Sequence, residues 1–138
     1  MKRDVQCFVT NNTDQSFYVQ TKDLSHGETD TAPQTIKANQ PSTLIFHFHK
    51  TTASTYGVTG SVTYELYDKS ILYFSFNCPY TQQGTEGEGN CFFYAGLQNV
   101  PAITTYTIEC TVSIDGNPMN ASNPAKGGTM VANIVIND

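Results

Sequence analysis

The chain has 138 residues, a length typical of one domain that can bury its own hydrophobic core. It carries 7 Lys and Arg against 12 Asp and Glu, and the net charge of −5 argues against the counterion release that drives binding to nucleic acid. The same balance argues against adsorption to anionic lipid by charge alone, which needs clustered Lys and Arg. We therefore expect no nucleic acid partner, and any membrane role would have to be lipid-specific.

No stretch approaches the roughly 20 apolar residues of a spanning helix, and the first residues lack the apolar core of a secretory signal. We therefore expect a soluble chain without a signal peptide. Its four cysteines contain no C-x-x-C pair, so reduced thiols are the simpler expectation; they are Cys7, Cys78, Cys91 and Cys110. A bridge between Cys78 and Cys91 remains an open alternative.

Apolar and polar residues alternate with a period of two, and no helical spacing is sustained over the length of a helix. In chain order the predicted strands are Val5–Thr10, Ser16–Gln20, Ser42–His49, Ser61–Tyr67, Ile71–Asn77, Cys91–Ala95, Thr104–Ile114 and Met130–Ile136. Short strands at near-regular spacing, separated by Asn, Asp and Gly turns, indicate a sandwich. We expect residues 1–138 to form one all-β, antiparallel β-sandwich.

Four of these strands should supply the centre of the core. Their expected inward residues are Leu44, Phe46 and Phe48, then Val62, Tyr64 and Leu66, then Leu72, Phe74 and Phe76, and finally Tyr106, Ile108, Cys110, Val112 and Ile114. Polar or Gly-rich composition predicts loops at Lys22–Asp30 and Thr81–Asn90, the latter expected to be mobile, and a long loop near 116–128 before the last strand.

Catalytic and metal sites are not expected. His47 and His49 lie on one side of a strand, a spacing compatible with a metal ion, with His26 as a conceivable third ligand. No carboxylate or cysteine accompanies them in sequence, so two solvent-facing histidines are the simpler interpretation. Nucleophile and phosphate-binding signatures are absent from the sequence, and its acids are scattered through turns. We predict a protein that is not an enzyme and has no cofactor.

The chain has more aromatic residues than its expected core needs. Six lie in loops or opposite the apolar strand faces, namely Tyr18, Tyr56, Tyr67, Tyr73, Tyr80 and Phe93. Exposed aromatic rings often mark interaction surfaces, and the alternative is a second buried face.

Several motifs occur in a characteristic order. Gly57-Val58-Thr59-Gly60-Ser61 enters a strand, a later strand ends in Asn77-Cys78-Pro79-Tyr80, and the chain opens with Arg3-Asp4-Val5 followed by Asn11-Asn12-Thr13. From about residue 3 to about residue 114 the sequence resembles the aegerolysin family, in a form closest to its bacterial insecticidal members. The resemblance implies a small β-sandwich that binds membrane lipids, often sphingolipids. Several members form pores only with a larger second protein.

The resemblance also indicates a recognition surface. His26 precedes Gly27 where the family has an aromatic residue, Tyr80 follows Pro79 where Trp is usual, and Tyr56 stands before the G-x-x-G turn where lipid-sensing members tend to have an acid. We expect His26, Tyr56 and Tyr80 to bind lipid. The expected function is lipid binding within a toxin or defence system, acting outside the cell, with a larger pore-forming partner. A lectin-like carbohydrate-binding module and a self-assembling structural β protein are the alternatives.

Overall fold

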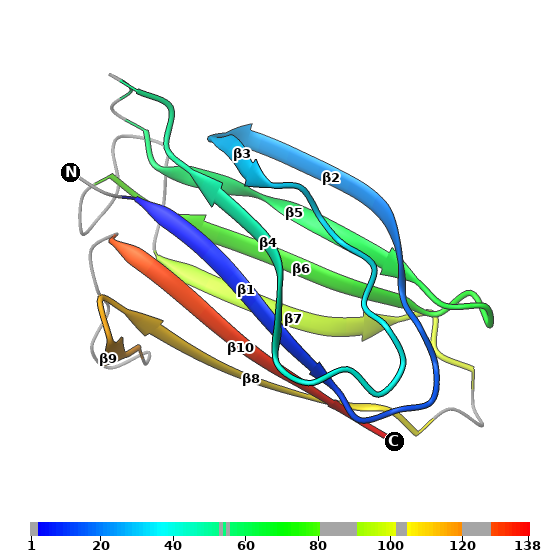
Figure 1. Ribbon diagram of the computed structural model, residues 1–138. Coiled ribbons are helices and arrows are strands. Elements are labelled where there is room, and N and C mark those ends of the chain that lie inside the picture. Colours follow the sequence, from blue (N-terminus) through cyan, green and yellow to red (C-terminus); the bar gives the residue numbers. More distant parts are fainter. Residues whose placement is uncertain (1–2, 53, 55, 81–90, 102–104, 120–127) are drawn as a thin grey trace.

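The computed structural model describes residues 3–52, 54, 56–80, 91–101, 105–119 and 128–138 (Figure 1). The strands in these ranges are, in chain order, β1 (Asp4–Asn11), β2 (Tyr18–His26), β3 (Glu28–Thr31), β4 (Thr43–His49), β5 (Val58–Glu65), β6 (Ile71–Cys78), β7 (Phe92–Gln98), β8 (Thr107–Ile114), β9 (Asn117–Pro118) and β10 (Thr129–Asn137). Nowhere in the described ranges does the chain build a helix with the length and apolarity needed to cross a bilayer.

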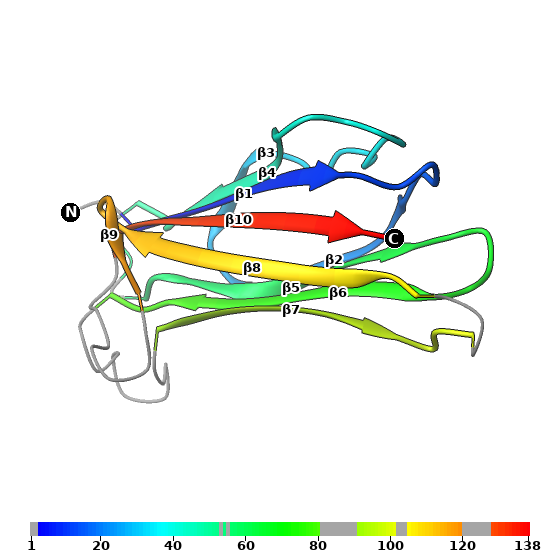
Figure 2. The same ribbon diagram turned by 90° about the horizontal axis from the view of Figure 1, so that it is seen from below.

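The strands form two packed layers, as Figure 2 shows. One sheet has the order β3-β4-β1-β10-β8-β9 and the other has the order β2-β5-β6-β7. The predicted all-β sandwich is confirmed. One pairing differs from the rest, because β1 and β10 run parallel, with Val5 opposite Met130 and Val9 opposite Ile134. The two ends of the chain are thereby joined at the centre of the larger sheet.

Aromatic side chains from both sheets fill the space between the layers. The Phe46 ring of β4 lies 5.7 Å from the rings of both Phe74 and Phe76 on β6, and Phe48 lies 5.6 Å from Phe76. The inward residues predicted on β5 and β6 are all buried, as are Phe46 and Phe48. Phe93, which could have been exposed, joins this cluster instead and stacks on Phe76 at 5.8 Å.

Strict alternation fails on β4. The pairing of β1 with β4 shifts between Cys7 and Phe8, whose partners are Phe46 and Leu44, so Ile45 is an extra residue. A β-bulge of this kind changes which side chain faces inward. Ile45 is consequently buried, while Leu44, the predicted core residue, is only half-buried.

The sheet edge accounts for a second difference. Cys110 was expected in the core but is exposed, because β8 is followed in its sheet only by the two-residue β9.

The predicted loop Lys22–Asp30 is also wrong, because these polar residues belong to β2 and β3. The final strand is confirmed. Most of the predicted loop near 116–128 and all of Thr81–Asn90 lie outside the described residues.

Candidate functional site

Several strand ends meet at the end of the sandwich where the N-terminus lies (Figure 1). The contact between Gly57 and β6 explains part of this arrangement, since a Cβ atom at Gly57 would lie 1.8 Å from the carbonyl oxygen of Cys78. Only glycine allows the backbone to come so close. Gly27, which follows His26, is also closely packed: a Cβ atom there would lie 3.2 Å from the carbonyl oxygen of His49 and 3.3 Å from the Val58 side chain. The segments that carry His26, Tyr56 and Tyr80 are therefore held at one end.

His26 and Tyr56 form a stacked pair. Their ring centroids are 4.1 Å apart and the ring planes differ by 1°. His26 is the last residue of β2, and the Tyr56 backbone N–H donates a hydrogen bond to Ser54 Oγ at 3.0 Å. Both rings are partly exposed, so together they present one flat, partly polar face.

Two cations lie close to the Tyr80 ring. The Arg3 guanidinium is 5.3 Å from the centroid of the Tyr80 ring, and the Lys50 ammonium is 5.5 Å from it. Both distances are within the range of cation–π attraction. Arg3 is buried and donates from Nε to the carbonyl oxygens of Pro79 and Tyr80, at 3.0 Å each. Arg3 therefore positions the segment before and including Tyr80.

Lys50 connects the Tyr80 ring to the Tyr56 segment. Its ammonium donates hydrogen bonds to the carbonyl oxygens of Thr51 at 3.0 Å and Ser54 at 2.8 Å, and the Lys50 backbone N–H donates to Arg3 at 2.9 Å. Thus all three residues predicted from the sequence lie in one cluster, which we call the ring cluster: His26, Tyr56 and Tyr80 with Arg3 and Lys50. Arg3 belongs to the opening motif, but no local pattern predicted its place in this cluster, because its partners are 76 and 77 positions away.

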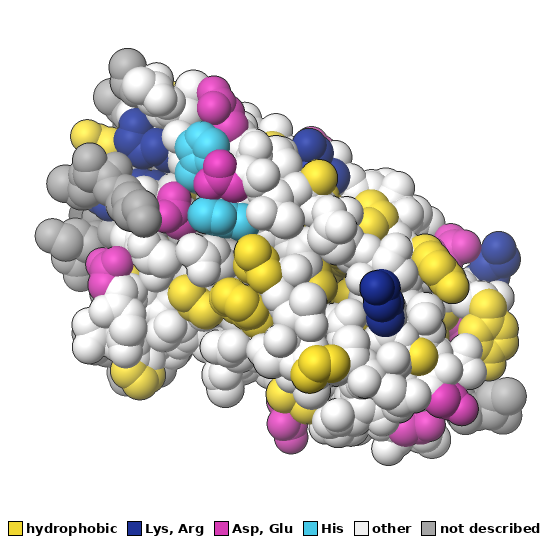
Figure 3. All heavy atoms as spheres, in the orientation of Figure 1, with side chains coloured by type: hydrophobic (Ala, Val, Ile, Leu, Met, Phe, Trp, Pro, Cys, Tyr) yellow, Lys and Arg dark blue, Asp and Glu magenta, His cyan; other side chains and the backbone are white. Residues whose placement is uncertain are grey.

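Beside the ring cluster, carboxylates contact two histidines on the outer face of β4, where Figure 3 shows histidine and acidic side chains together. Asp30 Oδ2 is 3.4 Å from His47 Nδ1 and 3.2 Å from His49 Nδ1. Glu28 Oε2 lies 3.4 Å from His49 Nε2, and Asp4 Oδ2 lies 3.9 Å from His47 Nε2. The expectation of solvent-facing histidines without acidic partners is therefore wrong. These contacts link β3, which follows His26 and Gly27, to β4 and β1.

A metal centre has no support here. Among the described residues, no group of three or more His, Cys, Asp and Glu side chains is arranged to hold a metal ion. His26, considered as a third ligand, stacks on Tyr56 instead.

Burial dominates the chemistry of the nearby thiols. It raises the pKa of Cys78 to about 11, and with the neighbouring Cys78 it raises the pKa of Cys91 to about 12. The Cys78 thiol contacts the carbonyl oxygen of Gly128 at 3.4 Å. A thiol held in its protonated form is a poor nucleophile, so Cys78 and Cys91 should react slowly at neutral pH.

The fold and ring cluster define a two-sheet β-sandwich with an aromatic and cationic end. No protein-family model matches the chain, and no curated protein matches it in sequence.

Solved structures share the fold. The lipid binding protein Nakanori has a TM-score of 0.69 at 12% identity, covering 100% of this chain and 72% of that one. RahU protein, in complex with a TRIS molecule, has a TM-score of 0.63 at 11% identity, covering 99% and 96%. IP-1A from Alcaligenes faecalis has a TM-score of 0.55 at 16% identity, covering 98% and 90%. At these identities the likeness concerns the fold alone, and it supports the aegerolysin-like fold that the motifs predict.

Proposed function

We propose that the protein is a non-enzymatic, membrane-lipid-binding member of the aegerolysin family. The observation that carries this proposal is the ring cluster, in which His26, Tyr56 and Tyr80 converge at one end beside two cations. The shared fold with a lipid binding protein supports the same function.

The chemistry of the ring cluster suits the boundary between lipid headgroups and acyl chains. Tyr and His have an apolar ring that can rest among the upper acyl carbons and a polar tip that stays hydrated. An ammonium has three N–H donors, and the Lys50 ammonium makes two hydrogen bonds to carbonyls at the base of the cluster. A phosphate oxygen above the Tyr80 ring would accept a third. The cluster thus favours a phosphate-bearing headgroup. The expected preference for sphingolipid mixtures over phosphatidylcholine, which carries the same phosphate, rests on the sequence resemblance.

The test is cosedimentation with vesicles of phosphatidylcholine alone, with added sphingomyelin and cholesterol, and with ceramide phosphoethanolamine. We expect binding to at least one sphingolipid mixture and none to phosphatidylcholine alone. Absence of binding to every mixture, with and without a candidate partner protein, would contradict the proposal.

Substitution of Tyr80 locates the binding surface. Tyr80→Ala should lower vesicle binding at least about fivefold, because one interfacial aromatic ring contributes about 1 kcal/mol. Tyr94→Ala is the matched control, since Tyr94 is 57% exposed on β7 and is not part of the ring cluster. If Tyr80→Ala changes only the melting temperature, Tyr80 is a packing residue and the assigned surface is wrong.

The same proposal extends to a two-component toxin or defence system acting on target membranes outside the producing cell, with a larger protein that forms the pore. The sequence resemblance supports this extension. The purified chain should then bind vesicles without releasing an encapsulated dye, and leakage should require the second protein. Strong leakage caused by this chain alone would overturn the requirement for a partner.

A further inference from the structure

A surface hollow lies at the opposite end of the sandwich from the ring cluster. Its volume is about 230 Å³, and it is lined by Tyr18, Val19, Gln20, Glu65, Leu66, Tyr67 and Lys69. Tyr18 begins β2, whereas His26 ends it, and at about 3.3 Å per residue the two are about 26 Å apart. The hollow and the ring cluster are therefore separate sites.

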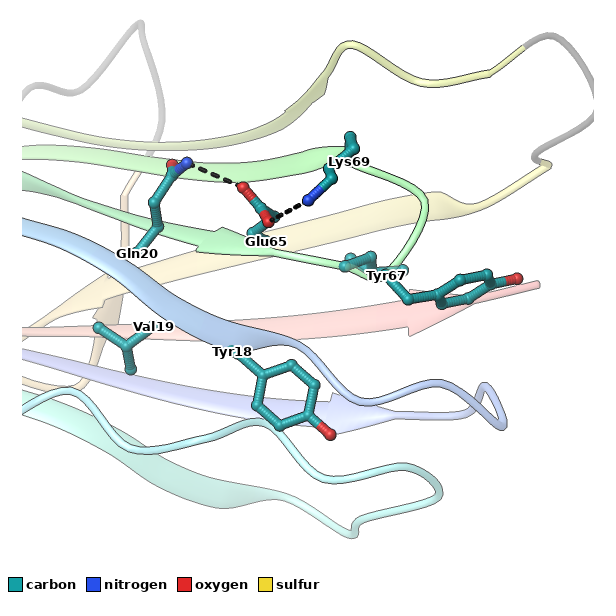
Figure 4. A pocket seen from close by; sticks show the side chains of 7 residues that line it. Tyr18, Val19, Gln20, Glu65, Tyr67 and Lys69 are labelled. Atoms are coloured by element: carbon teal, nitrogen blue, oxygen red, sulfur yellow. Dashed lines mark hydrogen bonds and ion pairs between the residues drawn. The ribbon is translucent and has the colours of Figure 1, made fainter.

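Two exposed tyrosines border this hollow, and both project from the strand ends in Figure 4. The Tyr18 side chain is 58% exposed and the Tyr67 side chain is 72% exposed. Tyrosine supplies a large rigid contact surface and loses little conformational entropy when it binds. Such exposed rings offer flat apolar faces to a small ligand.

A polar network lines the same hollow, and Figure 4 shows it beside the two tyrosines. Gln20 Nε2 donates to Glu65 Oε2 at 3.1 Å, and the Lys69 ammonium is 3.5 Å from Glu65 Oε1. Thr63 Oγ1 also donates to Gln20 Oε1 at 3.0 Å. The amide and the carboxylate are thus held in place before any ligand arrives, which reduces the ordering cost of binding.

The charge and size of the hollow restrict its ligand. Glu65 and Lys69 neutralise each other, so neither an anion nor a cation is favoured. Its volume of about 230 Å³ is below the roughly 300–1,000 Å³ of pockets for drug-sized ligands. The aliphatic lining consists of Val19 and the buried Leu66, which is too little for an acyl chain.

We propose that this hollow, lined by Tyr18, Gln20, Glu65 and Tyr67, binds a single neutral hexose unit of a glycan. A hexose ring has an apolar C–H face that can stack on tyrosine. Its neighbouring hydroxyl groups each donate and accept hydrogen bonds, which matches the amide, carboxylate and ammonium of the polar network. Because the hollow is shallow and the ligand small, the dissociation constant should be about millimolar.

The test is a titration of the ¹⁵N-labelled protein with the methyl glycosides of glucose, galactose, mannose and N-acetylglucosamine, followed by ¹H–¹⁵N spectra. At least one glycoside should give saturable shifts at the amides of Gln20, Glu65 and Lys69, with little change at His26 and Tyr56. Absence of saturable shifts for all four glycosides overturns the proposal, as do shifts confined to residues outside the hollow.

Variants of the two tyrosines identify the contact. Tyr18→Ala and Tyr67→Ala should each weaken binding at least about fivefold, because each removes a stacking face. Tyr67→Phe should retain most of the affinity, since the ring remains. Tyr94→Ala is the matched control, because Tyr94 has nearly the same exposure as Tyr18 but does not line the hollow. Unchanged affinity in both alanine variants overturns the site. None of these outcomes bears on vesicle binding by the ring cluster.

Discussion

At the scale of single residues, Gly57 has the strictest requirement at the ring cluster. A methyl group there would lie 1.8 Å from the Cys78 carbonyl oxygen, a backbone atom that cannot rotate away. Gly57→Ala should therefore lower the free energy of unfolding by about 2–3 kcal/mol, as overpacking does elsewhere. Urea unfolding measures this loss.

Gly96→Ala provides the control. The nearest atoms to its added methyl group belong to the side chain of Tyr94, which is exposed and can move. We expect a loss below about 1 kcal/mol, as for most surface substitutions. Equal losses in the two variants would show that the contact with Cys78 relaxes more easily than the geometry indicates.

The four cysteines differ in burial and therefore in their expected reactivity. Burial strongly raises the pKa of Cys7, and it raises the pKa values of Cys78 and Cys91 to about 11 and about 12. Because the thiolate is the reactive form, these thiols should react slowly at neutral pH and faster as the pH rises. Cys110 is exposed, although its pKa is also raised, so iodoacetamide should modify it first in the native protein.

Mass spectrometry of the native protein over time checks this order, and Cys110→Ser should remove the fast phase. All four cysteines are free thiols in the structure. Detection of fewer than four thiols in denatured, unreduced protein would support the alternative bridge between Cys78 and Cys91.

At the scale of elements, the bulge on β4 has a measurable consequence. Ile45 is 1% exposed and belongs to the core, whereas Leu44 is half-buried. Ile45→Ala should lower the free energy of unfolding by about 2–5 kcal/mol, because it leaves a cavity. Leu44→Ala removes a similar side chain from a less buried position and should cost about 1 kcal/mol. The reverse order in chemical unfolding would place the bulge elsewhere.

Local patterning was enough to predict most strands and much of the core, because buried and less buried residues alternate over the second half of β5 and over β6 from Ile71 to Phe76. It failed at Ile45, since a bulge depends on the partner strand. It also failed for the polar residues of β2, because this strand is exposed over most of its length and lacks the apolar alternation on which the prediction relied.

The ring cluster, too, could be predicted only in part from local sequence patterns. The motifs located His26, Tyr56 and Tyr80, but not their neighbours. Arg3 contacts Tyr80 from 77 positions earlier in the chain, and Asp30 contacts His47 and His49 across the pairing of β3 with β4. Contacts between residues distant in sequence depend on sheet order and register, and no local pattern encodes these.

At the scale of the whole molecule, the two proposed sites lie at opposite ends of a rigid sandwich. Tyr80 lies after the end of β6, and Tyr67 lies in the turn before its start, so the eight residues of β6 separate the two. Distant sites on one rigid fold should respond independently to mutation. Tyr80→Ala should therefore reduce vesicle binding and leave glycoside titration unchanged, and Tyr67→Ala should do the opposite.

The double variant Tyr67→Ala/Tyr80→Ala completes this cycle. Its losses in the two assays should equal those of the single variants, within about 0.5 kcal/mol for each binding free energy. A loss of both activities in either single variant would show that the ends are coupled, and the two-site arrangement would then be wrong.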